Sequence, residues 1–454
     1  MAAAKDEDTA AELTPAEPVK PAAVLGVREA HLEREPSIGK RFLKVLGPGL
    51  IVGASDDDPS GIGTYAVAGA SLGFATLWTA LVTFPLMAAI QFICAKIGLV
   101  TGMGLAGVMR RHYPKALLYP VIGALVIANS INAGADIGAI AAAINLLVPL
   151  PVAALIIPVA LTILVVQVWG SYRVIASIFK WLALALGAYI GAALFAKPDW
   201  SAVLRGTFLP RIHLDTQFVV TLMAILGTTI SPYMFFWQTN QEVEEDIEMG
   251  RKYLWQRKGT TDLELRYTAW DVNIGMFFSN LVMYFIILAT AATLFKSGHH
   301  DIQSAADAAK ALQPLAGKGA TMLLALGLIG SGFLAVPILT GSGAYALAEA
   351  VGWKSGLSEK PTRATQFYTV IALSTIFGME INFLGINPIS ALFWTAVVNG
   401  LLAPVLLFFI MLIANNKKIM GQRTNGLTSN VLGWAATAAM TLAAIGLILT
   451  WGKT

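Results

Sequence analysis

The chain has 454 residues, of which 56% are hydrophobic and only 13% are charged, and its mean hydropathy is +0.68. A soluble enzyme is excluded, because soluble domains carry about 25% charged residues. The net charge of +4 would favour nucleic acid in a soluble protein, but in a membrane protein Lys and Arg orient helices, so no nucleic-acid partner is expected. The single cysteine, Cys94, excludes an internal disulfide and a cysteine metal cluster.

The N-terminal region is rich in Ala, Pro and acidic residues and lacks the apolar core of a signal peptide. We expect residues 1–43 to form a disordered cytoplasmic tail. Residues 44–413 are predicted to form the transmembrane core of two five-helix repeats. Residues 414–454 are predicted to form a loop and a last, eleventh helix.

Eleven apolar stretches follow the tail, and most are long enough to cross a bilayer. They cover residues 45–72, 74–99, 117–149, 151–168, 171–196, 217–239, 271–295, 320–352, 364–384, 386–413 and 428–451. A cytoplasmic N-terminus places 22 of the 31 Lys and Arg residues on the cytoplasmic side. The positive-inside rule therefore predicts a multi-pass protein of the cell membrane with its N-terminus in the cytoplasm.

The first and sixth stretches are interrupted by proline, glycine and polar residues. Pro59 removes a backbone donor from the first, so we expect this helix to break between Asp58 and Gly61. In the sixth we expect the break between Thr228 and Pro232. Two broken helices at these places are typical of an inverted repeat of five plus five helices that binds its substrate at mid-membrane. The alternative is that proline and glycine merely kink two ordinary helices.

Acidic residues within the spans mark the candidate site. Asp58 and Asp136 lie deepest, and a carboxylate at such depth costs about 2.5–3.5 kcal/mol, so each needs a partner or a function. A helix that ends at Asp58 also directs its unpaired carbonyl groups at the carboxylate, which favours a cation over an anion. Asp56 and Asp57 either line the approach or bind water.

Three further features carry weaker predictions. Thr395 or Asn399, in the tenth stretch, adds a polar group to the site or forms an interhelical hydrogen bond. Residues 241–266 mix both charge signs and are predicted to be an ordinary solvated loop rather than a regulatory site. No catalytic constellation is visible, so the chain is not expected to be an enzyme.

At its broken helices the chain resembles the Nramp family of divalent metal transporters. The family's Asp-Pro-Gly-Asn motif in the first helix corresponds to Asp58–Gly61, and its Met-Pro-His motif in the sixth corresponds to Ser231–Tyr233. The resemblance covers nearly all of the helical region. It implies the LeuT-type fold with eleven transmembrane helices, two of them broken.

The resemblance also implies a ligand set for the transported metal. In the family the Asp, the Asn, the Met sulfur and a carbonyl one turn before the Met hold the ion. Here these positions correspond to Asp58, Gly61, Ser231 and the carbonyl of Thr228. Without the thioether, the remaining oxygen ligands suit Mg²⁺, as in the Nramp-related magnesium transporters that the chain is most similar to. Mn²⁺ is expected to bind as well.

The residues that the family uses for protons are altered. Its two histidines in the sixth helix correspond to Tyr233, kept here as an accessory site candidate, and Gln238, and its third-helix Glu corresponds to Ala139. All five histidines of the sequence fall outside the apolar stretches, so proton coupling is not expected. Asp136 either takes part in the site or pairs with a cation, for which Arg363 is the one candidate offered.

We therefore predict an importer of Mg²⁺, and of Mn²⁺ as a second ion, that works by alternating access in the lipid bilayer without proton coupling. It needs no bound cofactor and no obligatory protein partner. The alternatives are a proton-coupled Mn²⁺ or Fe²⁺ transporter of the same family, an amino-acid transporter of the same fold, and a non-transporting membrane receptor. The charge of Asp58 disfavours an amino-acid carboxylate as substrate, and a receptor has no need of two broken helices.

Overall fold

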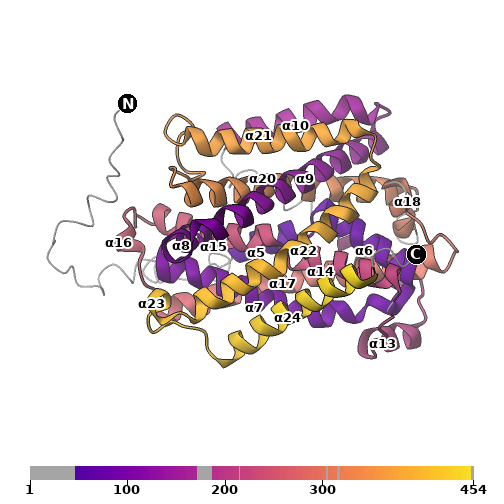
Figure 1. Cartoon of the computed structure of the whole chain (residues 1–454). Helices are drawn as coiled ribbons and strands as arrows, with labels where there is room; N and C mark the ends of the chain where they lie inside the picture. The colour runs from indigo at the N-terminus through magenta and orange to yellow at the C-terminus, as the bar shows by residue number, and fades with distance from the viewer. Residues whose placement is uncertain (1–46, 171–186, 214, 303–304, 314–316, 451–454) are drawn as a thin grey trace, which may run out of the picture.

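The computed structural model describes residues 47–170, 187–213, 215–302, 305–313 and 317–450, and every regular element in these ranges is a helix (Figure 1). The helices of eight or more residues are α5 (Pro48–Asp56), α6 (Pro59–Leu72), α7 (Trp78–Thr101), α8 (Leu105–His112), α9 (Lys115–Leu147), α10 (Val152–Trp169), α12 (Ala188–Phe195), α13 (Trp200–Phe208), α14 (Thr216–Thr229), α15 (Pro232–Glu248), α17 (Asp262–Thr290), α20 (Ala320–Val351), α21 (Thr365–Ile381), α22 (Pro388–Asn415) and α24 (Leu427–Thr450). The shorter elements are η1 (Gly73–Thr76), α16 (Leu254–Arg257), the π-helical turn η3 (Ala291–Phe295), α18 (Ala305–Ala309), η4 (Lys310–Leu312), η5 (Gly317–Gly319), η6 (Asn382–Leu384) and α23 (Lys417–Met420).

Nine segments of the described chain are long and apolar enough to cross a membrane. They match nine of the eleven predicted stretches, with α14 and α15 together forming one segment, Thr216–Glu248. The first predicted span consists of two short half-helices, and residues 171–186 of the fifth lie outside the described residues, as does the predicted tail. The total of eleven spans stays a prediction.

The two halves of the chain use equivalent neighbours. α5 in the first span packs on α17 in the seventh, and α15 in the sixth packs on α7 in the second. Exchanging the first five spans for the second five converts one of these pairs into the other. The third and eighth spans, α9 and α20, pack together, and α10 lies beside α21 (Figure 1). This is the arrangement expected of a five-plus-five repeat.

The first helix break lies at Asp57 and Asp58, between the end of α5 and the start of α6. The prediction that the break extends to Gly61 was wrong, because Pro59 does not end a helix here. It occupies the first position of α6, where its missing N–H is not needed and its fixed φ suits the helix. Asp58 caps this new helix by accepting the backbone N–H of Gly61 at 2.6 Å.

The second break lies at Ile230 and Ser231, inside the predicted window. α14 ends at Thr229 and α15 begins at Pro232. Both breaks therefore use the same local device, in which a polar residue precedes a proline at the first position of the second half-helix.

Half-helix α5 is fastened along α17. Near its middle, Gly53 meets the backbone of Gly275 so closely that neither position has room for a Cβ atom. α17 begins at Asp262, nine residues before the predicted span, so Asp271 lies inside the helix rather than at its end. From there Asp271 caps the start of α5. It accepts the backbone N–H groups of Gly47 at 2.8 Å, Gly49 at 2.6 Å and Leu50 at 3.1 Å.

Short helices mark the two ends of the bundle. α8, α16 and α23 lie at one end, and α13 and α18 lie at the other (Figure 1). Basic residues predicted to be cytoplasmic, such as Arg110 and Lys417, belong to the first group of helices, whereas Arg205 belongs to the second. The structure thus places at opposite ends the elements that the charge pattern assigns to opposite sides of the membrane.

The connector between α15 and α17 is not the solvated loop that its mixed charges predicted. Arg251 is 2% exposed and pairs with Asp246 at 3.0 Å and Glu264 at 2.7 Å, which are also buried. Arg257 donates to the carbonyl of Gly102 at the end of α7. The prediction failed because a mixture of signs lets charges compensate one another inside the protein as well as in water.

Candidate functional site

Asp58 lies at the first break and is 1% exposed, and both oxygens of its carboxylate accept hydrogen bonds. Its Oδ1 accepts the hydroxyl of Ser60 at 2.7 Å and the N–H of Gly61 at 2.6 Å. Its Oδ2 accepts the amide of Asn132, from α9, at 3.3 Å. The carboxylate therefore faces the positive end of α6 as well as the last carbonyls of α5, and the sequence had predicted only the second contact.

Oxygen atoms from both broken helices converge beside Gly61. A Cβ atom built on Gly61 would lie 3.0 Å from the carbonyl oxygen of Asp56, 3.3 Å from Thr228 Oγ1 and 3.4 Å from Asp58 Oδ1. One carbonyl, one hydroxyl and one carboxylate thus border the same point. Glycine leaves the point open, because any side chain would press against all three. These donors are of the type that Mg²⁺, Ca²⁺ and Mn²⁺ prefer.

Ser231 is buried at the second break, and its hydroxyl turns back onto α14. It donates to the carbonyls of Gly227 at 2.6 Å and Thr228 at 2.8 Å. The Thr228 carbonyl that was predicted as a ligand is therefore already an acceptor, with one further lone pair. The structure brings Asp58, Gly61 and the Thr228 hydroxyl together, and it places Ser231 next to them with its donor engaged elsewhere.

Asp136 is fully buried, and neither of its carboxylate oxygens has a hydrogen-bond partner among the described residues. The predicted pair with Arg363 is wrong. Arg363 is exposed in the turn before α21, because that helix begins only at Thr365. Asp136 instead lies close enough to Asp58 for their charges to interact. Asn132, one turn earlier on α9, bonds to Asp58, so this face of α9 belongs to the site.

The other acidic and aromatic candidates surround the end of α5. Tyr233 is buried and donates its hydroxyl to the carbonyl of Ser55 at 3.1 Å, which ties α15 to α5. Asp56 accepts a hydrogen bond from Ser279 of α17. Asp57 is 6% exposed, and its Oδ1 has no partner among the described residues. These residues shape the site from the side of α5.

Helix α22 supplies two predicted polar residues. Thr395 donates to the carbonyl of Leu392 in its own helix at 2.8 Å, so the interhelical bond expected of it was wrong. Asn399 is 1% exposed, and neither its amide nitrogen nor its amide oxygen has a partner within the described chain. α22 also touches both broken helices, through Leu392 against Gly63 and Ala396 against Gly227.

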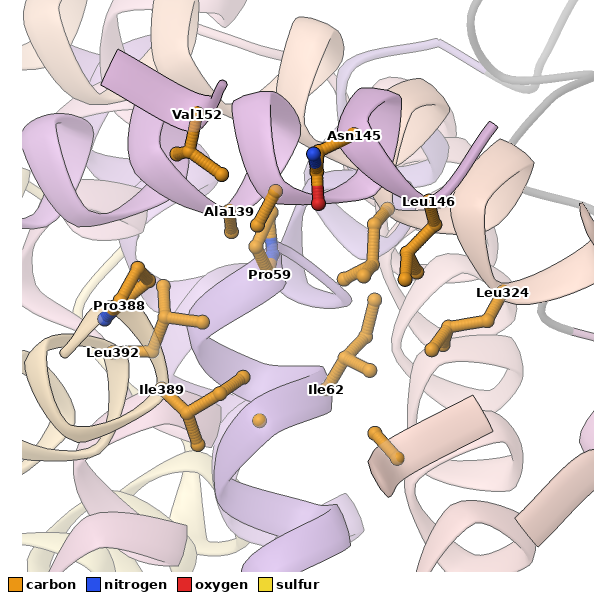
Figure 2. Close-up of a pocket in the computed structure, with 14 residues that line it drawn as sticks. Pro59, Ile62, Ala139, Asn145, Leu146, Val152, Leu324, Pro388, Ile389 and Leu392 are labelled. Atoms are coloured by element: carbon orange, nitrogen blue, oxygen red, sulfur yellow. The ribbon is translucent and has the colours of Figure 1, made fainter. Parts of the chain in front are cut away.

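A cavity of about 260 Å³ lies next to the first break. Figure 2 shows Pro59, the residue after Asp58, among its lining residues, together with Ala139 of α9 and Leu392 of α22. Ala139 is the position where the resemblance implies a Glu, so the loss of that side chain leaves space here. The remaining lining residues are mostly apolar and come from α6, α9, α10, α18, α20 and α22.

Water or protein oxygens must complete the shell of any cation at Asp58. Among the described residues, no three His, Cys, Asp or Glu side chains lie close enough to hold a metal ion. The described histidines, His112, His213, His299 and His300, lie outside the nine apolar segments. Such a site suits a hard ion that keeps part of its hydration shell.

Sequence reasoning missed several residues of this region. Asn132 lies four residues before Asp136, and this helical spacing could have identified it. Ser60 and Ser279 carry no comparable signal, because they are ordinary small polar residues in the sequence. They become part of the site only through their contacts with Asp58 and Asp56.

Comparisons with known proteins agree with this geometry. A family model described as natural resistance-associated macrophage protein-like (Nramp) matches residues 49–450. The divalent metal cation transporter MntH of Verminephrobacter eiseniae is 27% identical over 446 residues, which cover 94% of each chain. The crystal structure of the Eremococcus coleocola manganese transporter, in complex with an aromatic bis-isothiourea compound, has a TM-score of 0.72 at 19% identity and covers 92% of this chain and 88% of that chain. MHP1, a nucleobase-cation-symport-1 family transporter, has a TM-score of 0.55 at 12% identity and covers 89% of this chain and 92% of that chain. The structural matches establish the LeuT-type fold.

Proposed function

Because this chain belongs to the Nramp family, we propose that it carries divalent cations across the cell membrane by alternating access, with Mg²⁺ as the preferred ion and Mn²⁺ as a second one. The relatives above are named as divalent metal and manganese transporters. The N-terminus is cytoplasmic in this proposal, and the ions move inward. The membrane potential favours such movement by about 2.3 kcal/mol per charge per 100 mV.

One observation carries the preference for Mg²⁺. The point beside Gly61 is bordered by a carbonyl, a hydroxyl and a single carboxylate. Position 231, where the family resemblance implies a thioether, holds a serine. Sulfur selects softer ions, whereas oxygen donors and water suit Mg²⁺.

The space around the break supports a partly hydrated ion. Mg²⁺ gives up its water reluctantly and usually binds through one or two carboxylates. Six waters occupy roughly 180 Å³ at about 30 Å³ each, and the cavity beside Pro59 measures about 260 Å³. The cavity therefore has room for waters next to the break, where Pro59 follows Asp58 directly, while Asp58 itself lies outside the lining.

Mg²⁺ uptake is expected to carry no stoichiometric proton flux, because the described histidines lie outside the spans and Ala139 replaces the implied Glu. The measurement is uptake of Mg²⁺, Mn²⁺ and Cd²⁺ into proteoliposomes with a trapped pH dye and a clamped membrane potential. Protein-free liposomes serve as the control. Internal acidification that increases in proportion to Mg²⁺ uptake would contradict the proposal.

That contrary result would favour the second candidate, a proton-coupled Mn²⁺ or Fe²⁺ transporter. Asp136 is the observation in its favour, since it is a buried carboxylate without a hydrogen-bond partner among the described residues and lies near Asp58. Such a group is able to carry a proton if its affinity changes when the metal binds.

Replacing Ser231 by methionine is expected to raise Cd²⁺ affinity about tenfold, which corresponds to about 1.4 kcal/mol. The change supplies a sulfur ligand and releases the carbonyls of Gly227 and Thr228 from the serine hydroxyl. Isothermal titration calorimetry measures the effect. Ser231→Leu is the matched control, because it adds similar bulk without sulfur. An equal gain in both variants would show that sulfur plays no part.

A further inference from the structure

Near the end of half-helix α15, the carboxylate of Glu244 accepts hydrogen bonds from α20 and from the connector that follows α20. Glu244 is 8% exposed. Its Oε1 accepts the hydroxyl of Tyr345, from α20, at 2.9 Å, and its Oε2 accepts the hydroxyl of Ser358, from the α20–α21 connector, at 2.9 Å. Two parts of the chain more than 100 positions apart, α15 and the end of α20 with its connector, thus meet at one side chain.

The α20–α21 connector, residues 352–364, is shaped around this contact. The Tyr345 hydroxyl accepts the N–H of Leu357 at 2.9 Å while it donates to Glu244. Gly356 has φ +142°, and a Cβ atom there would lie 2.8 Å from Glu244 Oε1. Glycine is therefore required at this position by both the backbone conformation and the closeness of the carboxylate.

The ring of Tyr345 is held independently of its hydroxyl. It packs edge-on against Trp237 of α15, with the ring centroids 6.2 Å apart. It also packs in a tilted arrangement against Phe367 of α21, with the centroids 4.8 Å apart. Removal of the hydroxyl alone would therefore leave the aromatic packing in place. This separates the hydrogen bond from the packing in an experiment.

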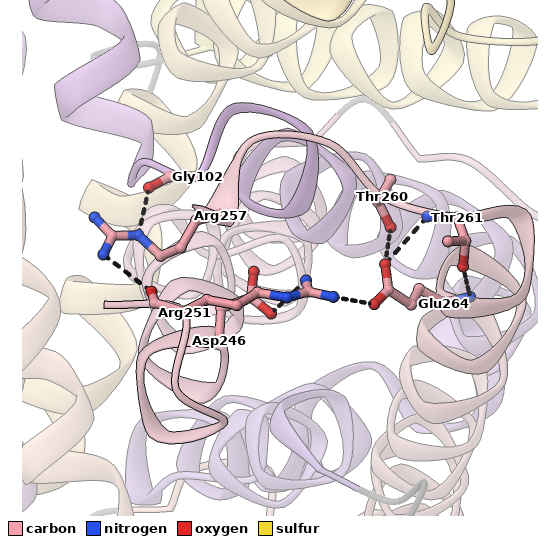
Figure 3. Close-up of polar contacts among 7 residues, drawn as sticks. All are labelled: Gly102, Asp246, Arg251, Arg257, Thr260, Thr261 and Glu264. Carbon is pink, nitrogen blue, oxygen red and sulfur yellow. Dashed lines mark hydrogen bonds and ion pairs between the residues drawn. The ribbon is translucent and has the colours of Figure 1, made fainter. Parts of the chain in front are cut away.

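On its other side, α15 is held by buried ion pairs rather than by hydroxyl groups. Figure 3 shows Arg251 between Asp246, at the end of α15, and Glu264, in the first turn of α17. The connector also reaches α7, since Arg257 donates to the Gly102 carbonyl at 3.2 Å. α15 is thus joined to α17 and α7 by buried ion pairs and backbone contacts, whereas hydroxyl groups join Glu244 to α20 and its connector.

The difference between these two sets of contacts indicates which helices move apart. The separation is expected between α15 and α20, where hydroxyl groups rather than buried ion pairs make the contact. α7, α15 and α17 are tied together at the end of the molecule where α16 and α23 lie. α20 packs along α9, and its Glu349 accepts the N–H groups of Gly104 at 3.0 Å and Gly107 at 3.1 Å at the start of α8. α20 and its connector therefore form the facing group together with α8 and α9.

α15 runs from the second break to its contact with α20, and the 12 residue steps from Pro232 to Glu244 span about 18 Å. A movement at Glu244 would therefore be transmitted along a rigid helix to the region of Ser231.

We propose that Glu244, Tyr345 and Ser358 form a latch that closes the cytoplasmic side of the transporter and opens when the cation is released. This inference rests on the proposed transport function and its orientation. The latch is engaged in this structure, in which Asp58 is buried and the cavity beside Pro59 lies on the α6 side of the break. Cytoplasmic opening requires Glu244 to leave both hydroxyls, since they belong to the facing group of helices.

The test measures the distance between the two connectors by double electron–electron resonance. Spin labels are attached to Lys252→Cys and Lys360→Cys, both exposed positions, in a Cys94→Ser background that removes the single native cysteine. In metal-free proteoliposomes, Tyr345→Phe is expected to shift the ratio of separated to closed molecules about tenfold toward the separated form. Ser358→Ala is expected to act in the same direction, and the two changes together are expected to exceed either alone.

Tyr368→Phe is the matched control. Its hydroxyl donates to the carbonyl of Glu359 at 3.0 Å and so supports the same connector without touching Glu244. If Tyr345→Phe and Tyr368→Phe change the distances equally, or if neither changes them, the latch is refuted. A lower melting temperature without a change in distances would also refute it, because it would show a purely structural role.

The same variants are assayed for uptake. Weaker cytoplasmic closure depletes the outward-facing form, so Tyr345→Phe is expected to raise the KM for external Mg²⁺, whereas Tyr368→Phe leaves it unchanged. The distance measurement needs no transported ion. Failure of Mg²⁺ uptake in the unmodified protein would therefore refute the proposed function and leave the distance result standing, and unchanged distances beside normal uptake would refute the latch alone.

Discussion

Asp58→Ala is expected to abolish divalent cation binding and uptake, with at least a hundredfold loss of Mg²⁺ flux. Asp58 supplies the carboxylate at the point where the two broken helices converge, which the carbonyl of Asp56 and the hydroxyl of Thr228 also border. Without it, the carbonyl and hydroxyl oxygens have no charged partner with which to hold the ion. Calorimetric titration and proteoliposome uptake measure the two effects.

Two controls separate the charge of Asp58 from its capping of α6. Asp58→Asn keeps an acceptor for the Gly61 N–H and loses the charge, so it is expected to fold normally and still fail to transport. Asp215→Asn changes an equivalent cap, on α14, where Asp215 accepts the N–H of Phe218. It is expected to retain full uptake. Normal Mg²⁺ flux in a folded Asp58→Ala protein would remove Asp58 from the site.

Arg251→Met is expected to lower the free energy of unfolding by about 3–5 kcal/mol, because it leaves two buried carboxylates without their shared guanidinium. Asp246 and Glu264 are 1% and 0% exposed, so water does not replace the lost partner. Thermal unfolding in detergent, followed by tryptophan fluorescence, measures the loss as a lower melting temperature.

Arg423→Met provides the comparison for Arg251. Arg423 contacts Asp262, whose side chain is 89% exposed, and an exposed pair of this kind contributes less than about 1 kcal/mol. Its melting temperature is expected to stay near that of the unmodified protein. Equal stability of the Arg251 and Arg423 variants would show that the buried pairs are replaceable by packing.

The sequence by itself determined the nine long spans of the described chain and the two helix breaks. Long apolar stretches form helices in a membrane because no water is present to satisfy the backbone, and proline after a polar residue is favoured at the first position of a new half-helix. These effects are local, so Pro59 and Pro232 identified the breaks to within a few residues. Asp58 could also be identified, because a carboxylate in an apolar stretch is costly unless it has a function.

Only the tertiary structure decided which distant residues complete the site. Asn132 bonds to Asp58 across 74 positions, and Asp271 reaches the start of α5 across more than 220. Arg251 and Glu244 looked like members of a solvated loop, and packing against other helices buried both of them. Such partners cannot be identified from the sequence, because a polar residue in solvent and a polar residue in a buried hydrogen-bond network look the same in a sequence. The position of neighbouring helices determines which of the two it occupies.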